Sequence, residues 1–229
     1  MRFVDLGRPI QTLMPVFGTV TRTHVGVYRS HQQSLRPGGI SSQTSIIVMS
    51  DHAGTHVDAP IHFNPEGKTI DQMPLDLMMG DAVVLDFSNK KSGDSVTVEA
   101  VQKKLKDASI APSAIKVILF KTGAAELYGT EQYFKHYLEI HHKAVQWMAE
   151  NGIKLWGVDA STIDHAHDRA THMLLRKLEF YHMENLANLD ALPVNSPFTL
   201  ICIALPFVGA TASPLRPIAI LKDEEEIQT

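Results

Sequence analysis

The stretch DHAGTHVDAPIHF, residues 51–63, is unusually rich in side chains that bind metals or move protons. Gly54 and Pro60 both oppose a helix interior, the proline by roughly 3 kcal/mol. Read as an extended chain, the polar candidates all fall at even-numbered positions: His52, His56, Asp58 and His62. The odd-numbered positions from 57 onward are apolar: Val57, Ala59, Ile61 and Phe63. Because side chains alternate across a strand, the apolar set is expected to pack on a core and the polar set to face one common space.

A straight strand does not bring the polar set together. At about 3.3 Å per residue, His52 and His56 would stand roughly 13 Å apart. Two nitrogens that share one metal, each about 2.0–2.1 Å from it, must be much closer. Gly54 lies between them and can bend the chain at little cost. The stretch therefore predicts a kinked strand, or a strand-to-loop passage, around one or two cations.

Composition limits the class of protein. The chain has 229 residues, of which 44% are hydrophobic and 20% charged, and its net charge is −4. We expect one globular domain over residues 1–229. The sequence has no long basic run, which argues against nucleic-acid binding. The single cysteine, Cys202, excludes a disulfide framework and a thiolate metal site.

The sequence gives no sign of a targeting or membrane segment. The start, MRFVDLGRPI, lacks a continuous apolar region of the kind found in signal peptides. The apolar run near residue 200 is too short to span a membrane and contains Pro206. We therefore expect a cytoplasmic protein without membrane contact.

Strands and helices are expected to alternate in the middle of the chain, with strands gathered at both ends. The predicted strands are 44–50, 80–88, 116–123, 153–160, 200–207 and 216–222. The predicted helices are 96–108, 131–152 and 168–180, and residues 1–41 are expected to be irregular. This order predicts an α/β fold with some parallel and some antiparallel pairing. No glycine-rich phosphate loop is present.

The string His52-Ala-Gly54-Thr55-His56-Val-Asp58-Ala-Pro60-Ile-His62 resembles the HxGTHxDxPxH signature of the metal-dependent cyclase hydrolase family, which includes bacterial kynurenine formamidases and isatin hydrolases. Further segments resemble other parts of that family: VDLGRPI (4–10), WGVDASTID (156–164), the run from His172 to Glu184 followed by NLANLDALP, and ATASPLRPIAI (210–220). The resemblance thus extends over most of the chain.

The resemblance implies a swivelling β/β/α domain with a mixed sheet, and a homodimer or tetramer. It implies that His52, His56 and Asp58 bind metal. It also implies that His172 and Glu184 hold a second metal together with Asp58, and that His62 is the general acid/base. Departures occur at PVFGTVTRT (15–23), at Ala160-Ser161 and at Ala212. These positions shape the substrate pocket rather than the metal site.

This donor set suits hydrolysis of a small amide or lactam, as in an arylformamidase. Nitrogen and oxygen donors without thiolate suit Zn or Mn, and the ligands suffice for two divalent cations. A bound cation of this kind lowers the pKa of its water from 15.7 to about 7, which makes hydroxide available. Asp58, with two oxygens, can bridge two cations. An unperturbed imidazole has a pKa near 6.5, so His62 is of the right type to take and return a proton.

Two other functions remain open. A lactone hydrolase or a cyclase could use the same hydroxide. A non-catalytic metal-binding or ligand-binding protein could keep the metal ligands but would not need His62, and the presence of that residue favours an enzyme.

Several further residues are weaker candidates. Asp159 and Asp164 follow a predicted buried strand, and Asp159 either orients a metal ligand or serves as a turn or cap. Others could contact substrate or line the pocket: His165, His167, His24, His31, Phe17 and Tyr28. A third group is expected on a solvated helix face: His136, His141 and His142.

Overall fold

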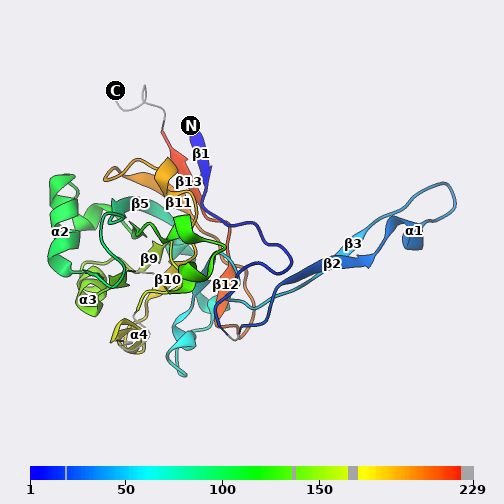
Figure 1. Ribbon diagram of the computed structural model, residues 1–229, viewed down its shortest axis with the longest axis horizontal. Coiled ribbons are helices and arrows are strands. Elements are labelled where there is room, and N and C mark those ends of the chain that lie inside the picture. The colour runs from blue at the N-terminus through cyan, green and yellow to red at the C-terminus, as the bar shows by residue number, and fades with distance from the viewer. Residues whose placement is uncertain (19, 136–137, 165–169, 223–229) are drawn as a thin grey trace.

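The computed structural model describes residues 1–18, 20–135, 138–164 and 170–222 (Figure 1). Its main element is a nine-stranded sheet with the strand order β1-β13-β11-β5-β7-β9-β10-β4-β12. These strands are β1 (Arg2–Asp5), β4 (His56–Asp58), β5 (Met79–Asp86), β7 (Val117–Lys121), β9 (Leu155–Val158), β10 (Tyr181–Glu184), β11 (Phe198–Ile201), β12 (Ala212–Pro214) and β13 (Ile218–Leu221). The neighbours from β5 to β10 are parallel and the remaining pairs are antiparallel. The predicted mixed α/β fold is confirmed.

Three helices gather at one side of the sheet (Figure 1). They are α2 (Val98–Asp107), α3 (His142–Glu150) and α4 (Ala170–Leu175). Val101 and Leu105 of α2 are buried with Trp156 of the sheet, as the amphipathic pattern of residues 96–108 predicts. Among the described residues, no helix is long and apolar enough to cross a membrane.

The other face of the sheet carries a second apolar cluster. Val57, Leu119, Leu155 and Met183 point into it from four different strands. Because the central parallel strands are covered on both faces, they appear in the sequence as almost unbroken apolar runs. That continuity is why the strands at 80–88, 116–123 and 153–160 were predictable.

A hairpin arm projects from the body of the molecule (Figure 1). It consists of β2 (His24–Arg29), the four-residue helix α1 (His31–Ser34) and β3 (Thr44–Val48). All five residues of β3 are exposed, so the arm has no core of its own. The strand predicted over 44–50 is confirmed, whereas the irregular structure predicted for 1–41 is wrong where β1 and β2 form.

The helix predicted over 131–152 is wrong in its first half. Residues Glu131–Phe134 form a 3₁₀ turn, and β8 (Glu139–Ile140) pairs in parallel with β6 (Ser95–Val96). The helix α3 begins only at His142, and the side chain of His141 caps it by accepting a hydrogen bond from the backbone N–H of Lys143. A long-range strand pairing overrides the local helical periodicity here.

Residues 51–63 form the kinked passage that the sequence predicts. A turn at 51–54 leads into β4, which is followed by a 3₁₀ turn at Pro60–His62. Gly54 adopts φ +70°, a conformation that favours glycine. The predicted bend is therefore confirmed.

The predicted alternation also holds along β4 but ends at the 3₁₀ turn. Val57 and Ala59 are buried in the core cluster, as expected. Phe63 instead lies on the polar side, with its ring centroid 4.2 Å from that of His62. A 3₁₀ turn has about three residues per turn, so it breaks the period of two that the sequence pattern assumed.

Gly54→Ala tests whether the turn brings the imidazoles together. An alanine in this left-handed conformation should reduce the free energy of unfolding by about 1–2 kcal/mol. The new Cβ would also lie 2.9 Å from Met14 Cε, the end of a flexible side chain that can move away, so the strain falls on the backbone turn between His52 and His56. We therefore expect weaker binding of divalent cations by calorimetric titration.

Gly152→Ala is the matched control. Gly152 has φ +84°, and a Cβ there meets no atom within 4 Å. This variant should lose similar stability in urea unfolding but keep its cation affinity. Wild-type cation affinity in Gly54→Ala would show that the turn does not set the position of the imidazoles.

Candidate metal centre and its pocket

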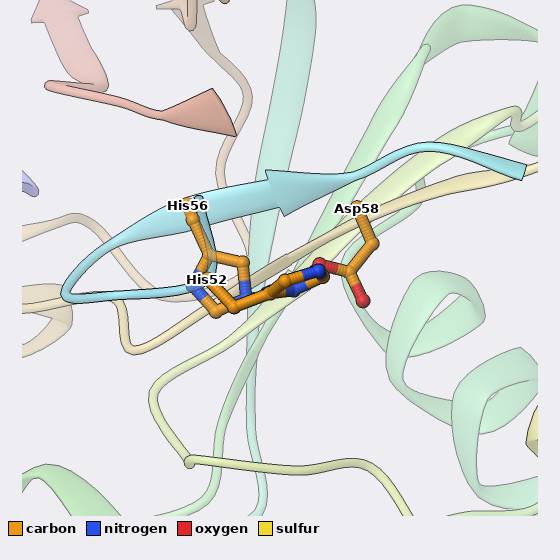
Figure 2. Close-up of side chains that lie close together, drawn as sticks. All are labelled: His52, His56 and Asp58. Atoms are coloured by element: carbon orange, nitrogen blue, oxygen red, sulfur yellow. Dashed lines mark ion pairs between the residues drawn. The ribbon is translucent and has the colours of Figure 1, made fainter. Parts of the chain in front are cut away.

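Two imidazoles and one carboxylate converge on the same side of β4 (Figure 2). His52 Nδ1 lies 2.9 Å and His56 Nε2 3.1 Å from Asp58 Oδ1. One donor atom from each of the three residues falls within 4.8 Å of the others. Donors at about 2.0–2.2 Å around one tetrahedral ion stand roughly 3.4 Å apart. The cluster could therefore hold a divalent metal ion.

The outer hydrogen bonds of both histidines fix which ring nitrogen carries hydrogen. His56 Nδ1 lies 2.8 Å from the carbonyl oxygen of Gly54, which can only accept, so Nδ1 is the protonated nitrogen. The Thr211 hydroxyl donates to Asp51 Oδ2 at 2.7 Å and therefore accepts from His52 Nε2 at 2.9 Å. In its neutral form, each ring thus turns a bare nitrogen toward Asp58.

Asp58 Oδ1 faces these two nitrogens as a further acceptor. Among the described residues, this buried oxygen has no hydrogen-bond partner. Three acceptors facing one point repel one another unless positive charge lies between them. The donor chemistry therefore fits a cation with nitrogen and oxygen ligands.

Glu184 joins this cluster from the neighbouring strand. In the antiparallel pair of β10 with β4, Glu184 lies opposite His56 and His182 lies opposite Asp58. Glu184 Oε2 is 3.8 Å from His56 Nε2. The strand β10 was not predicted: the sequence analysis assigned no strand directly after the helix proposed for 168–180.

His182 was missed by sequence reasoning. Its Nε2 atom lies 3.4 Å from Asp58 Oδ2 and 3.5 Å from Glu184 Oε1. The available signal was its position two residues before Glu184, which places both side chains on one face of a strand.

His172 lies on α4 and lines the same pocket as Glu184. Its Nδ1 is 2.6 Å from Asp164 Oδ2, and its backbone N–H donates to the same oxygen at 2.8 Å. The contact between His172 Nδ1 and Asp164 leaves His172 Nε2 free to bind a metal ion, and metal-bound histidines commonly have such a carboxylate partner. In the described part of the chain, His172 forms no ion pair with Asp58 or Glu184. Its predicted role as a ligand stays a prediction.

His62 lies at the rim of the cluster. Its Nε2 is 3.8 Å from Asp58 Oδ2, and its ring centroid is 4.1 Å from that of His52. Its side chain is 34% exposed, against 3% for His56. Burial lowers the pKa of His62 below its ordinary value, although the charge of Asp58 opposes this shift. A more accessible and neutral imidazole is suited to accept a proton.

The buried acidic and imidazole groups of the cluster shift one another's pKa values. Burial alone would raise the pKa of Asp58, but the facing histidines His182, His52 and His56 hold it well below its usual value. Burial alone would lower the pKa of His56, but Asp58 and Glu184 raise it to about 9. The two carboxylates thus create a negative field that favours bound protons or a bound cation.

Two roles were left open for Asp159, and in the structure it is a capping residue. Its carboxylate accepts hydrogen bonds from the backbone N–H groups of Thr122 and Gly123 at 2.8 and 3.0 Å. It therefore holds the end of β7 rather than a histidine of the cluster. Asp164, not Asp159, orients a histidine of the pocket.

The remaining candidates divide clearly. Phe17 lines the pocket and packs edge-to-face against Phe134 at 6.1 Å. Tyr28 lies on the arm and is 71% exposed. His24 and His31 also lie on the arm and are not among the described pocket-lining residues, so the expectation that they line it is wrong within this chain. His165, His167 and His136 lie outside the described residues.

The cluster forms the polar end of a cavity of about 180 Å³. Aromatic and apolar side chains form much of its wall, including Phe17, Phe63 and Phe134. Ser161 and Asn185 add polar groups beside the cluster. An apolar cavity with a few convergent polar groups is typical of a small-molecule site.

Known proteins share this sequence and fold. Residues 4–165 match the Cyclase family model. Kynurenine formamidase of Paracidovorax citrulli is 30% identical over 176 residues, which cover 76% of this chain and 78% of that protein. Kynurenine formamidase of Bacillus cereus is 29% identical over 219 residues, 94% of this chain and 96% of that protein.

Solved structures agree with this relationship. Isatin hydrolase A from Labrenzia aggregata, bound to benzyl benzoate, superposes with a TM-score of 0.83 at 25% identity. The superposition covers 97% of this chain and 94% of that one. An isatin hydrolase bound to the product analogue thioisatinate has the same fold, with a TM-score of 0.84 at 18% identity. The matched family model, together with the relatives in sequence and structure, shows that this chain belongs to the cyclase family.

Proposed function

We propose that this protein is a metal-dependent hydrolase that cleaves the C–N bond of a small amide or lactam. The observation that carries the proposal is the convergence of two bare imidazole nitrogens, from His52 and His56, on a buried oxygen of Asp58 without a hydrogen-bond partner among the described residues. The named relatives, kynurenine formamidase and isatin hydrolase, support an amide or lactam as the substrate class.

The donor set would hold Zn or Mn, with two divalent cations per chain. His52, His56 and Asp58 Oδ1 would hold the first, and Asp58 Oδ2 with Glu184 and His172 the second. Asp58 supports this division because Oδ1 faces His52 and His56, whereas Oδ2 faces away toward His62 and His182. Cations held there supply Lewis acidity and a water of lowered pKa.

His62 is the proposed general acid/base. Water attacks the carbonyl carbon of the substrate and gives a proton to the neutral imidazole. The imidazolium then returns that proton to the leaving nitrogen as the C–N bond breaks, which gives an amine and a carboxylic acid, and the acid then ionises to the carboxylate.

The pocket favours a small and flat substrate. At about 180 Å³ the cavity is smaller than the roughly 300–1,000 Å³ common for drug-sized ligands. Phe17, Phe63 and Phe134 offer aromatic surfaces. An aromatic ring would pack on these surfaces while its amide or lactam carbonyl points to the cluster.

The arm supports assembly with a second copy of the chain. Its exposed apolar side chains include Val27, Tyr28, Ile46 and Ile47. Ile46 and Ile47 are adjacent on one strand and so point to opposite faces, which leaves both faces uncovered. An isolated two-stranded hairpin is marginally stable in water. We therefore propose a homodimer or tetramer in which the partner covers the arm.

Metal content tests the donor set. Protein loaded with Zn²⁺ or Mn²⁺ and then dialysed should retain up to two cations per chain by elemental analysis. A chelator should abolish hydrolysis, and added cation should restore it. His52→Ala should lose at least one cation, whereas His142→Ala, at the start of α3 outside the pocket, should lose none. Wild-type protein that retains no cation would refute the proposal.

His62→Ala tests the proton-transfer step. We expect kcat on an amide or lactam to fall by about 10²–10⁴ with the metal content unchanged. An activated ester of matching shape should lose less, because its leaving group departs without a proton. Comparing kcat/KM for both substrates gives the difference as a free energy.

The His62 variant has informative alternative outcomes. Equal losses on amide and ester would mean that His62 serves the attacking water and not the leaving nitrogen. Loss of metal in parallel with activity would make His62 a ligand. Wild-type turnover of lactones alone, across a broad panel, would favour the lactone hydrolase.

Ile47→Glu tests the arm. The wild-type chain should sediment as a dimer or tetramer at micromolar concentration. A charge at Ile47, which is 58% exposed, should shift the mass toward the monomer. Leu75→Glu, which changes an 80% exposed residue outside the arm, should not. A monomeric wild type, or equal effects of both variants, would argue against assembly through the arm.

A further inference from the structure

His182 is a buried imidazole that the family signature does not explain. Its side chain is 1% exposed, and its Nε2 atom lies 3.4 Å from Asp58 Oδ2 and 3.5 Å from Glu184 Oε1. Among the described residues, its Nε2 atom has no hydrogen-bond partner. A buried ring nitrogen without a hydrogen bond is costly, so the two nearby carboxylates must compensate for it, through a bound proton or through a shared cation.

The strand register of the sheet determines where the Nε2 atom of His182 lies. His182 lies opposite Asp58 on β4 and opposite Trp156 on β9. The indole of Trp156 stacks on the imidazole, with ring centroids 5.4 Å apart and planes inclined by 23°. The stack fixes the plane of the ring, and Nε2 then faces Asp58 and Glu184.

The distances match those between two ligands of one ion. Nε2 lies 3.4 Å from Asp58 Oδ2 and 3.5 Å from Glu184 Oε1, without the geometry of a hydrogen bond to either. Donors at about 2.0–2.2 Å in a tetrahedral zinc site are separated by roughly 3.4 Å. The spacing is therefore too long for a good hydrogen bond and fits a shared cation.

A purely structural role explains less. A core histidine normally directs its nitrogens to hydrogen-bond partners, and a ring serving only as packing needs no alignment with two carboxylates. Asp58 Oδ1 already faces His52 and His56, so Oδ2 is the oxygen left for a second ion. His182 is the imidazole nearest to both Oδ2 and Glu184 Oε1 among the ion pairs that the described residues form.

We propose that His182 is a ligand of the second cation, which it binds through Nε2 together with Asp58 Oδ2 and Glu184 Oε1. This inference rests on the proposed metal-dependent function and adds a donor to the ligand set implied by the family resemblance. It gives the second position an imidazole from the rigid sheet, independently of His172 on α4. With His172 retained, the first position has two imidazoles and one carboxylate, and the second has two imidazoles and two carboxylates.

The test is calorimetric titration of metal-free protein with Zn²⁺, and a parallel titration with Co²⁺ followed by visible absorption. Wild type should bind two equivalents. His182→Phe keeps the stacked ring but removes both nitrogens, and His182→Gln keeps a polar side chain. In both variants the second equivalent should bind at least about 10–100-fold more weakly, with a changed Co²⁺ spectrum, while the first should change little.

Tyr181→Phe is the matched control. Tyr181 is the preceding residue of β10, and its side chain points to the opposite face of the sheet. There it packs in the same apolar cluster as Val57 and Met183. This variant should bind both equivalents as wild type does. A general disturbance of β10 would affect Tyr181→Phe as well, whereas loss of a ligand would not.

The outcomes separate this inference from the proposed function. Folded His182 variants that bind the second equivalent with wild-type affinity would overturn the inference and leave the hydrolase intact. A wild type that binds one cation and hydrolyses amides would do the same. A wild type that binds no cation would refute both. If neither variant folds, anomalous scattering from crystals of the wild-type Zn²⁺ complex decides: Nε2 at about 2.0–2.1 Å from the second ion supports the proposal, and Nε2 beyond 3 Å overturns it.

Discussion

The pairing of β4 with both of its neighbours is the constraint on which the site depends. β4 has only three residues, and its register places His56 opposite Glu184 and Asp58 opposite His182 on β10. A slip of one residue would turn every one of these β4 side chains to the other face of the sheet. Val57, fully buried on that other face, opposes such a slip, because it would exchange an apolar core side chain for a charged one. The core therefore fixes the geometry of the chemistry.

The register brings two carboxylates into a place where water cannot neutralise them. Asp58 and Glu184 are both buried, and isolated charges in such a place are very unfavourable. The surrounding imidazoles allow two solutions: they can carry protons, or they can share cations with the carboxylates. The raised pKa of His56 reflects the first solution, in which a bound proton offsets the negative charge of the carboxylates. Burial alone would have lowered that pKa. The bare nitrogens of the neutral His52 and His56 rings are what the second solution requires.

Local patterns predicted the parts of the site that depend on local geometry. The alternation of residues 51–63, with Gly54 at the bend, was sufficient to place His52, His56 and Asp58 on one side. It failed at Phe63, because the 3₁₀ turn at Pro60–His62 changes the period. The helix predicted over 131–152 failed for a different reason, since β8 is stabilised by a partner far away in the sequence.

Other parts could not be predicted because they are created only by pairing. The strand β10 is a four-residue segment that follows a predicted helix, and its partners β4 and β9 are distant in sequence. Without that strand, the sequence gives no reason to place His182 beside Asp58. The choice between Asp159 and Asp164 as the partner of a histidine was similar. Both follow β9, but only the folded chain brings Asp164 to His172.

One line of side chains across the sheet explains why His182 belongs to both core and site. Val83, Ile118, Trp156, His182 and Asp58 lie opposite one another on successive strands. The first three are apolar and fully buried, and the last two are polar. His182 is the residue at which the line changes character: one side of its ring is covered by Trp156, and its Nε2 faces the carboxylates. A donor held by strands and core packing has little freedom to move, whereas a donor on a short helix such as α4 depends on the segment that carries it. The proposed site therefore derives its rigidity from the same packing that holds the sheet together.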